Sequence, residues 1–289
     1  CHGYEKTARG GPIAGNLVLT GDRGPMFSHA YFTLTVTGAF SDGRNRPASN
    51  LPPRAIGSSA SRILTMANGS HHDAKLSPQE LTTLRLWIES AAPYPGTYAS
   101  LGCGMIGGYE ENQQVHTDHH WPTSQAAAAV IDQRCAACHT GNPLPPIPRT
   151  LSDERGTCFW RPPVPNRVHL TSRHIVFNLT RPEQSLALLA PLAREAGGFQ
   201  LCGKPGYPAP VLPNKDDPAY QAILAMIAAG QRDLETRTRF DMPHFTPRPA
   251  YIREMKRYGI LPPDLPDSAR IDPYDTDRRY WESLWYAPP

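Results

Sequence analysis

The clearest pattern of apolar and polar positions lies in residues 76–91. Ser77 stands before Pro78, and Glu80 follows three residues after the serine, which is a capping-box signature for the start of a helix. Pro93 marks its end. The apolar positions recur at helical spacing on one stripe: Leu81, Leu84 and Ile88, with Trp87 beside them. We therefore predict an amphipathic helix that packs on a core.

Further segments favour helices. Residues 123–134 are rich in strong helix formers without a breaker, and Thr123 or Ser124 can serve as the cap. Start and stop signals predict additional helices over residues 182–193, from Pro218 onward, and over residues 249–258, the last closed by Gly259. These helices are expected to contribute the core.

Two short apolar runs, Leu17–Leu19 and Phe32–Val36, predict short strands or extended packing segments. They lie in residues 11–57, a region rich in Gly, Pro, Asn and Ser. The 289-residue chain has 32 prolines, which are spread throughout. Because proline interrupts helices, we predict a mainly α protein in which short helices are joined by long Pro- and Gly-rich loops.

Composition narrows the class of protein. Apolar residues make up 39% of the chain, enough for the core of one large or two small domains. The net charge of +3 is too small to indicate a nucleic-acid partner. No apolar run reaches the roughly 18 residues that a membrane span needs. We therefore expect neither a nucleic-acid partner nor a membrane span.

One motif points to a specific chemistry. Cys135, Cys138 and His139 have the Cys-x-x-Cys-His spacing of c-type haem attachment. Two thiols on one helical turn reach the two vinyl groups of a porphyrin, and the adjoining imidazole becomes the proximal iron ligand. The alternatives are a redox dithiol or a zinc site, but a zinc site needs two more ligands at comparable spacing. We predict covalent haem on these three residues.

The first residues suggest a second haem. Cys1 and His2 are followed by glycine, and Cys-His-Gly is how many haem c motifs end. Three interpretations remain open: the remnant of a first haem motif, the lipidated terminus of a bacterial lipoprotein, or an ordinary cysteine. In the first interpretation Cys1 supplies a thioether and His2 an iron ligand. His71 or His72, just before the helix at 76–91, would then face the iron from the distal side.

The distal ligand of the haem on His139 is expected further along the chain. Met242 is followed by proline and an aromatic residue, which is a common setting for the distal methionine of a cytochrome c. The predicted helix at 249–258 closes this segment. Met242 is therefore the first choice, with His174 and His244 as alternatives; a core methionine is the plainer interpretation. A thioether raises the iron potential relative to bis-histidine ligation.

Two cytochrome c-like haem domains follow from these sites. Residues 1–100 form the first, with a motif truncated at the N-terminus, residues 101–119 a linker, and residues 120–289 the second. Covalent haem attachment is completed outside the cytoplasm, so we expect the periplasm or the cell surface. Disulfides form there. Cys158 and Cys202 are the expected pair, and the odd Cys103 could pair with either.

Several longer stretches match a known family: residues 1–7, 19–23, 52–58, 69–98, 174–183 and 239–281. In these stretches the chain resembles the C-terminal, haem-bearing part of hydrazine synthase alpha-subunit-like proteins. The resemblance implies two haems. In true hydrazine synthase the motif histidine of the catalytic first haem can leave the iron for zinc, and a nearby tyrosine takes the iron. By that resemblance His2 would bind zinc and Tyr4 iron, while the second haem would be six-coordinate and pass electrons.

The leading functional prediction is an extracytoplasmic di-haem c-type cytochrome that exchanges electrons with redox partner proteins. One alternative is a haem oxidoreductase related to hydrazine synthase, acting on a small nitrogen compound at an open first haem. Another is a haem-bearing structural subunit of a larger redox assembly. Whether the chain is an enzyme thus depends on the coordination of the first haem: a five-coordinate haem favours the enzyme, and a six-coordinate one favours electron transfer.

Overall fold

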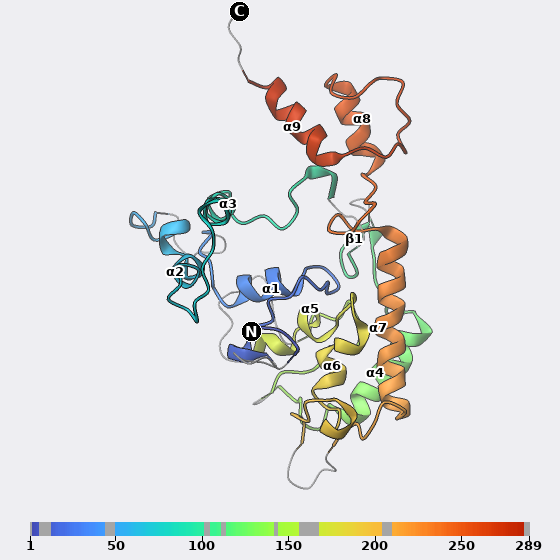
Figure 1. Cartoon of the computed structure of the whole chain (residues 1–289). Coiled ribbons are helices and arrows are strands. Elements are labelled where there is room, and N and C mark those ends of the chain that lie inside the picture. Colours follow the sequence, from blue (N-terminus) through green and yellow to red (C-terminus); the bar gives the residue numbers. More distant parts are fainter. Residues whose placement is uncertain are drawn as a thin grey trace, which may run out of the picture. The chain divides into compact units, whose positions relative to one another are not determined.

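The computed structural model describes most of the chain, in ranges separated by gaps (Figure 1). These ranges are residues 2–5, 13–43, 50–100, 105–110, 114–141, 144–155, 168–203 and 210–285. Within them the chain is mainly helical and has one two-stranded sheet. The mainly α class is therefore confirmed.

The residues group into two compact units. The first unit comprises residues 1–93 and 118–231, and the second comprises residues 94–117 and 232–289. Helix α7 (Pro218–Arg237) continues through the boundary between residues 231 and 232. The sequence predicts two haem domains, residues 1–100 and 120–289, with a linker at 101–119. This division is defined by the expected haem sites, and it stays a prediction.

The first unit is assembled from several short helices and from most of the longer helix α7 (Figure 1). α1 packs on α5, and α5 also contacts α6, while α2 contacts α3. The regular elements of this unit are α1 (His29–Val36), α2 (Arg62–Met66), α3 (Pro78–Glu89), α4 (Pro122–Arg134), α5 (Arg173–Val176), α6 (Leu186–Leu189) and most of α7, with 3-10 helices η1 (Ala14–Asn16), η2 (Ser58–Ala60), η4 (Val168–Thr171), η5 (Pro182–Gln184) and η6 (Arg194–Ala196).

Helix α3 confirms the prediction for residues 76–91. The Ser77 hydroxyl accepts a hydrogen bond from the Glu80 amide at 3.3 Å, and the Glu80 carboxylate accepts one from the Ser77 amide at 2.8 Å. Ile88 is buried with Phe40 and Ala92. The partly buried residues packed around them are Leu34, Ile63, Leu64, Leu84 and Trp87. The cap and the apolar stripe therefore act together, as the sequence indicates.

We expect Ser77→Ala to lower the free energy of unfolding by about 1 kcal/mol, because the helix loses the side-chain acceptor for an otherwise unpaired amide. Chemical denaturation of the purified protein measures this loss. Thr82→Ala is the control, because its hydroxyl donates to the Pro78 carbonyl within the same exposed helix and caps nothing. Equal losses in the two variants would contradict a capping role.

The strand prediction for Phe32–Val36 is wrong, because these residues belong to α1. Ser28 caps the helix by accepting from the Tyr31 amide at 3.3 Å, and the Thr35 hydroxyl donates to the Tyr31 carbonyl at 2.8 Å. Residues on all sides of α1 are buried, so the sequence carries no amphipathic period. Leu17–Leu19, in contrast, is extended, as predicted, and the side chain of its central residue is fully buried.

Two further predictions need correction. Helix α4 begins at Pro122 with Trp121 as its cap residue and no side-chain cap, whereas Thr123 or Ser124 was expected there. The Ser124 hydroxyl instead donates to the buried carboxylate of Asp118 at 2.7 Å. The predicted helix over 182–193 is divided into η5 and α6, because Ser185 has an extended backbone between them.

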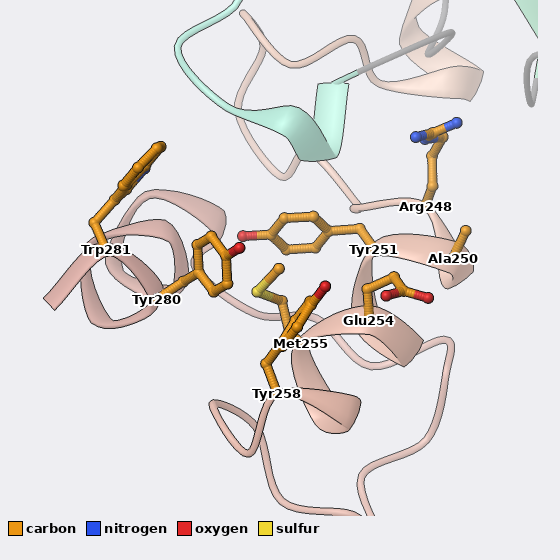
Figure 2. A pocket seen from close by; sticks show the side chains of 8 residues that line it. All are labelled: Arg248, Ala250, Tyr251, Glu254, Met255, Tyr258, Tyr280 and Trp281. Carbon is orange, nitrogen blue, oxygen red and sulfur yellow. The ribbon is translucent and has the colours of Figure 1, made fainter. Parts of the chain in front are cut away.

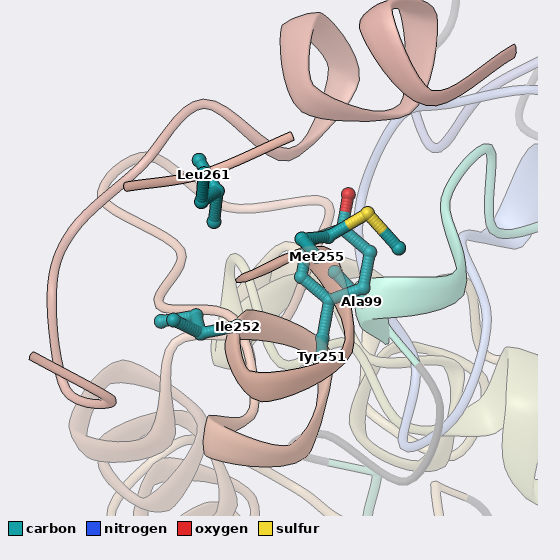
Figure 3. Packing of buried hydrophobic residues seen from close by; sticks show 5 residues of the cluster. All are labelled: Ala99, Tyr251, Ile252, Met255 and Leu261. Carbon is teal, nitrogen blue, oxygen red and sulfur yellow. The ribbon is translucent and has the colours of Figure 1, made fainter. Parts of the chain in front are cut away.

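The second unit contains α8 (Pro249–Arg257), α9 (Pro273–Ser283), η3 (Tyr98–Ser100) and a small antiparallel sheet of β1 (Tyr109–Glu110) and β2 (Gln114–Val115). Gly259, just beyond α8, has φ +71°, which confirms the predicted glycine closure. Figure 3 shows the core of this unit around α8. The buried residues of that core are Ala99, Tyr251, Ile252, Met255 and Leu261.

Candidate haem sites

The Cys-x-x-Cys-His motif lies directly after α4, which delivers it as the sequence predicts. The amides of Cys138 and His139 both donate to the Cys135 carbonyl, at 3.1 and 3.0 Å, so the motif is a tight turn. The Nδ1 atom of His139 lies 2.9 Å from the Pro145 carbonyl oxygen. Since a carbonyl only accepts, Nδ1 carries the proton and Nε2 keeps its lone pair for a metal.

The two cysteines of this turn are partly buried. Burial is the main reason that the pKa of Cys135 is raised to about 12, and the neighbouring Cys202 and Cys138 add to it. Burial, with a contribution from Cys138, also raises the pKa of Cys202 to about 11. Cys202 therefore lies close to the motif.

The predicted Cys158–Cys202 disulfide stays a prediction. Cys158 and the alternative partner Cys103 lie outside the described residues. Cys1, the predicted thioether residue of the first haem, lies outside them as well.

His2 is held firmly by the segment that follows it. Its Nδ1 lies 2.7 Å from the Ala14 carbonyl oxygen, and its own carbonyl accepts from the Leu19 amide at 2.7 Å. Gly15, with φ +65°, passes so close that a Cβ there would lie 3.6 Å from Cε1 of the ring. As at His139, the proton is fixed on Nδ1 and the lone pair of Nε2 is left for another partner.

That partner is His71. The two Nε2 atoms of His2 and His71 lie 3.5 Å apart, the ring centroids 5.8 Å apart, and the ring planes differ by 11°. The centroid separation equals the Nε2 separation plus one ring radius on each side, so the rings meet end to end and not face to face. His72 is exposed and touches the His71 ring edge-on, with centroids 4.8 Å apart. Of the two predicted distal residues, His71 is the one that faces His2.

Tyr4 has a different partner. Its hydroxyl donates to Nδ1 of His29 at 2.5 Å, and Nε2 of His29 donates to the Phe177 carbonyl at 3.2 Å. Both side chains are buried. Burial, followed by the charge of Asp22, raises the pKa of Tyr4 well above its ordinary value. In this structure the tyrosine is a neutral hydrogen-bond donor, and its predicted role as an iron ligand remains an expectation from the family resemblance.

Asp22 is hydrogen-bonded to several groups of this buried region. Its carboxylate accepts from Asn178 at 2.7 Å and from Arg181 at 2.7 Å, while its carbonyl accepts from the His29 amide at the start of α1. Burial would raise the pKa of Asp22, but the hydrogen bonds and the charge of Arg181 outweigh it, and the pKa lies below the ordinary value.

The lowered pKa of Asp22 has a consequence for stability at acid pH. A carboxyl group with a depressed folded-state pKa stabilises the fold above its unfolded pKa, about 3.9, and loses that contribution as pH falls through the folded-state value. We expect the melting temperature of Asp22→Asn to depend less on pH below 4 than that of the unmodified protein. Calorimetry between pH 2.5 and 7 checks this. Parallel curves for the two proteins would contradict it.

The candidates for the distal ligand of the His139 haem lie in different places. His174 is fully buried in the first unit, with ring centroids 5.2 Å from Phe27 and 4.8 Å from Phe32, and its Nε2 lies 3.8 Å from the Glu154 carboxylate. Met242 is partly buried and His244 exposed, and both belong to the second unit. The choice of Met242 over His174 and His244 stays a prediction.

Other histidines have protein partners. His116 bonds to the Asp233 carboxylate at 2.8 Å, and Nδ1 of His119 lies 3.2 Å from the Thr150 hydroxyl. Among the described residues, no group of three or more His, Cys, Asp or Glu side chains could hold a metal ion. The zinc role of His2, expected by resemblance, stays a prediction.

The second unit also has a pocket of about 340 Å³ (Figure 2). Its walls come from α8, α9 and the residues next to α8, and the rings of Tyr251, Tyr258 and Tyr280 lie close together there. The lining residues are Arg248, Ala250, Tyr251, Glu254, Met255, Tyr258, Tyr280 and Trp281. None of them is a cysteine or a histidine, so this pocket lacks the donors that the candidate haem sites have.

Comparisons with protein families, with curated proteins and with solved structures found no match. The resemblance noted from the sequence is therefore an expectation. In the part of the chain that the structure describes, no helix has both the length and the apolar composition needed to cross a bilayer.

Proposed function

We propose that the protein is an extracytoplasmic c-type cytochrome that holds two haems and transfers electrons. One observation carries the proposal: His2 and His139 have the same local arrangement. Each directly follows a cysteine, and each has its Nδ1 bound to a carbonyl oxygen of a segment that follows it in the chain, Ala14 at 2.7 Å and Pro145 at 2.9 Å. The same orientation of a motif histidine at two places supports two sites of one kind.

The residues of the second site fit haem c. Cys135 and Cys138 would form the two thioether bonds, and His139 would be the proximal ligand. The bound haem would supply the redox chemistry, which is a reversible one-electron change at iron. The chain's own residues hold the proton on Nδ1, orient the ring and strengthen the ligand, because a hydrogen bond from Nδ1–H makes Nε2 more basic.

The burial of Cys135 bears on how haem would be attached. A thiol reacts as its thiolate. With a pKa of about 12, the folded chain has little thiolate at neutral pH. Haem attachment would therefore require Cys135 to become more accessible than it is in this fold.

The two alternatives differ from this proposal in the coordination of the first haem and in the kind of partner protein that each requires. A haem oxidoreductase acting on a small nitrogen compound needs an open iron position at the first haem. A structural subunit of a redox assembly needs stable partner subunits. Electron transfer needs only redox partner proteins that approach the haems, and we favour it because the ring of His71 faces His2.

A pyridine haemochrome assay, with protein quantified on the same sample, tests the proposal. The chain is produced in a bacterial strain with haem attachment machinery and isolated from the periplasm. We expect two covalent haems per chain. One haem would restrict the proposal to the Cys135 motif, and the absence of haem would refute it. If the sample contains no haem and all of its thiols react with an alkylating reagent, the result would instead support the redox-dithiol alternative for Cys135 and Cys138.

A further inference from the structure

We infer that the first haem is closed, with His2 and His71 as its two axial iron ligands. The inference rests on the proposed function, because it requires a haem at the first site. It goes further, because it assigns the sixth ligand and removes the open iron position that a substrate would need.

The alignment of the two rings is the first support. Two imidazole nitrogens bonded to one metal ion on opposite sides lie about 4 Å apart, since each metal–nitrogen bond is about 2 Å. The observed Nε2 separation of 3.5 Å is near this value, and the end-to-end arrangement directs both lone pairs at one point between the rings. As a direct hydrogen bond, 3.5 Å is longer than the usual range of about 2.7–3.2 Å.

The backbone around His71 is the second support, because hydrogen bonds fix the turn that carries this residue. The amide of Gly69 donates to the Ala74 carbonyl at 2.8 Å, and the amide of Ala74 donates to the His71 carbonyl at 2.9 Å. His72 and Asp73 have φ values of 49° and 61°, in the left-handed region, which is uncommon outside glycine but which His and Asp adopt more often than most residues. In this tight turn between α2 and α3, the ring planes of His71 and His72 differ by 77°. Of the two rings, that of His71 faces His2.

The hold on His2 is the third support. Its Nδ1 and its carbonyl are both hydrogen-bonded, to Ala14 and Leu19 respectively, and the next carbonyl, of Gly3, accepts from the Ile13 amide at 2.8 Å. The ring of His2 is fixed by its own hydrogen bond, and the backbone of His71 is fixed by its turn, so the two residues form a preorganised pair. A pair of protein ligands suits haem, because the porphyrin supplies the other four nitrogens of an octahedral iron.

This arrangement has a functional consequence. Bis-histidine ligation gives a lower iron potential than histidine–methionine ligation, and it leaves no position for a small molecule. The first haem would then be the low-potential member of the pair if Met242 completes the second. Substrate chemistry at the first haem would require His71 to leave the iron.

The test compares His71→Ala with His72→Ala in the protein carrying both haems. We expect His71→Ala to convert one of the two ferric haems from low spin to high spin, and to add one carbon monoxide-binding ferrous haem per chain relative to the unmodified protein. His72→Ala should match the unmodified protein in both measurements. His71→Met provides a variant that keeps an axial ligand, and it should raise the midpoint potential of one haem while that haem stays low spin.

The outcomes distinguish this inference from the proposed function. Two haems per chain with unchanged spectra in His71→Ala would overturn the ligand assignment and leave the cytochrome proposal intact. A high-spin first haem in the unmodified protein would also overturn the ligand assignment, and it would favour the oxidoreductase over electron transfer while keeping two haems per chain. A single haem per chain would overturn both the first site and the inference. Circular dichroism and the haem count of each variant show whether a spectral change reflects a lost ligand or a lost fold.

Discussion

Replacing both Cys135 and Cys138 with alanine should reduce the covalent haem content from two per chain to one. Neither thioether bond can form without the thiols, and His139 alone would hold haem only by coordination. Mass spectrometry of the denatured protein measures the number of attached haems directly, because covalent haem survives denaturation whereas coordinated haem does not.

Cys202→Ser is the matched control for this double variant. Cys202 lies close enough to the motif to affect the pKa of Cys135, but it is not part of the Cys-x-x-Cys-His sequence. We expect it to keep two haems. Loss of haem in Cys202→Ser, or two attached haems in the double alanine variant, would show that the attachment site has been assigned to the wrong cysteines.

Asp118→Ala should lower the free energy of unfolding by about 3 kcal/mol or more. The Asp118 carboxylate is completely buried, and it accepts from the Ser124 hydroxyl at 2.7 Å, the Leu151 amide at 2.9 Å and both the amide and hydroxyl of Ser152, at 3.1 and 2.7 Å. Alanine would leave these donors without their acceptor, and each buried, unpaired donor costs about 1–3 kcal/mol.

Denaturant unfolding of the purified protein measures this effect. Asp267→Ala is the control, because Asp267 is a half-exposed carboxylate paired with Lys256 at 2.7 Å and with Arg253 at 3.4 Å. Such exposed pairs contribute about 0–1 kcal/mol. Similar losses in the two aspartate variants would mean that the network around Asp118 contributes little.

The parts of this protein that the sequence predicts well are those that depend on neighbouring residues. Helix α3 could be predicted because its capping box and its apolar stripe lie within one short segment. Helix α1 could not, because it is buried on all sides, and its β-branched residues favour a strand when only local preference is considered. Its helical form depends on packing against α5, which lies far along the chain.

The candidate sites divide in the same way. Cysteine and histidine side chains reveal a haem motif, since the chemistry needs those residue types at fixed spacing. The carbonyl groups of Ala14 and Pro145, which orient His2 and His139, have no sequence signal, because every residue carries a carbonyl. Whether His71 or His72 faces His2 depends on left-handed backbone angles in a turn, and the sequence alone left both open.

The two hydrogen bonds that fix His2 would lower the reorganisation energy of electron transfer at an iron bound there. Electron transfer is slowed when ligands must move between the oxidised and reduced states, and groups fixed in advance reduce this reorganisation energy. The ring of His2 is anchored through Nδ1 to Ala14, and its peptide is anchored to Leu19. His71 is anchored by the backbone bonds of its own turn. An iron between two such ligands would gain or lose an electron with little movement of the protein.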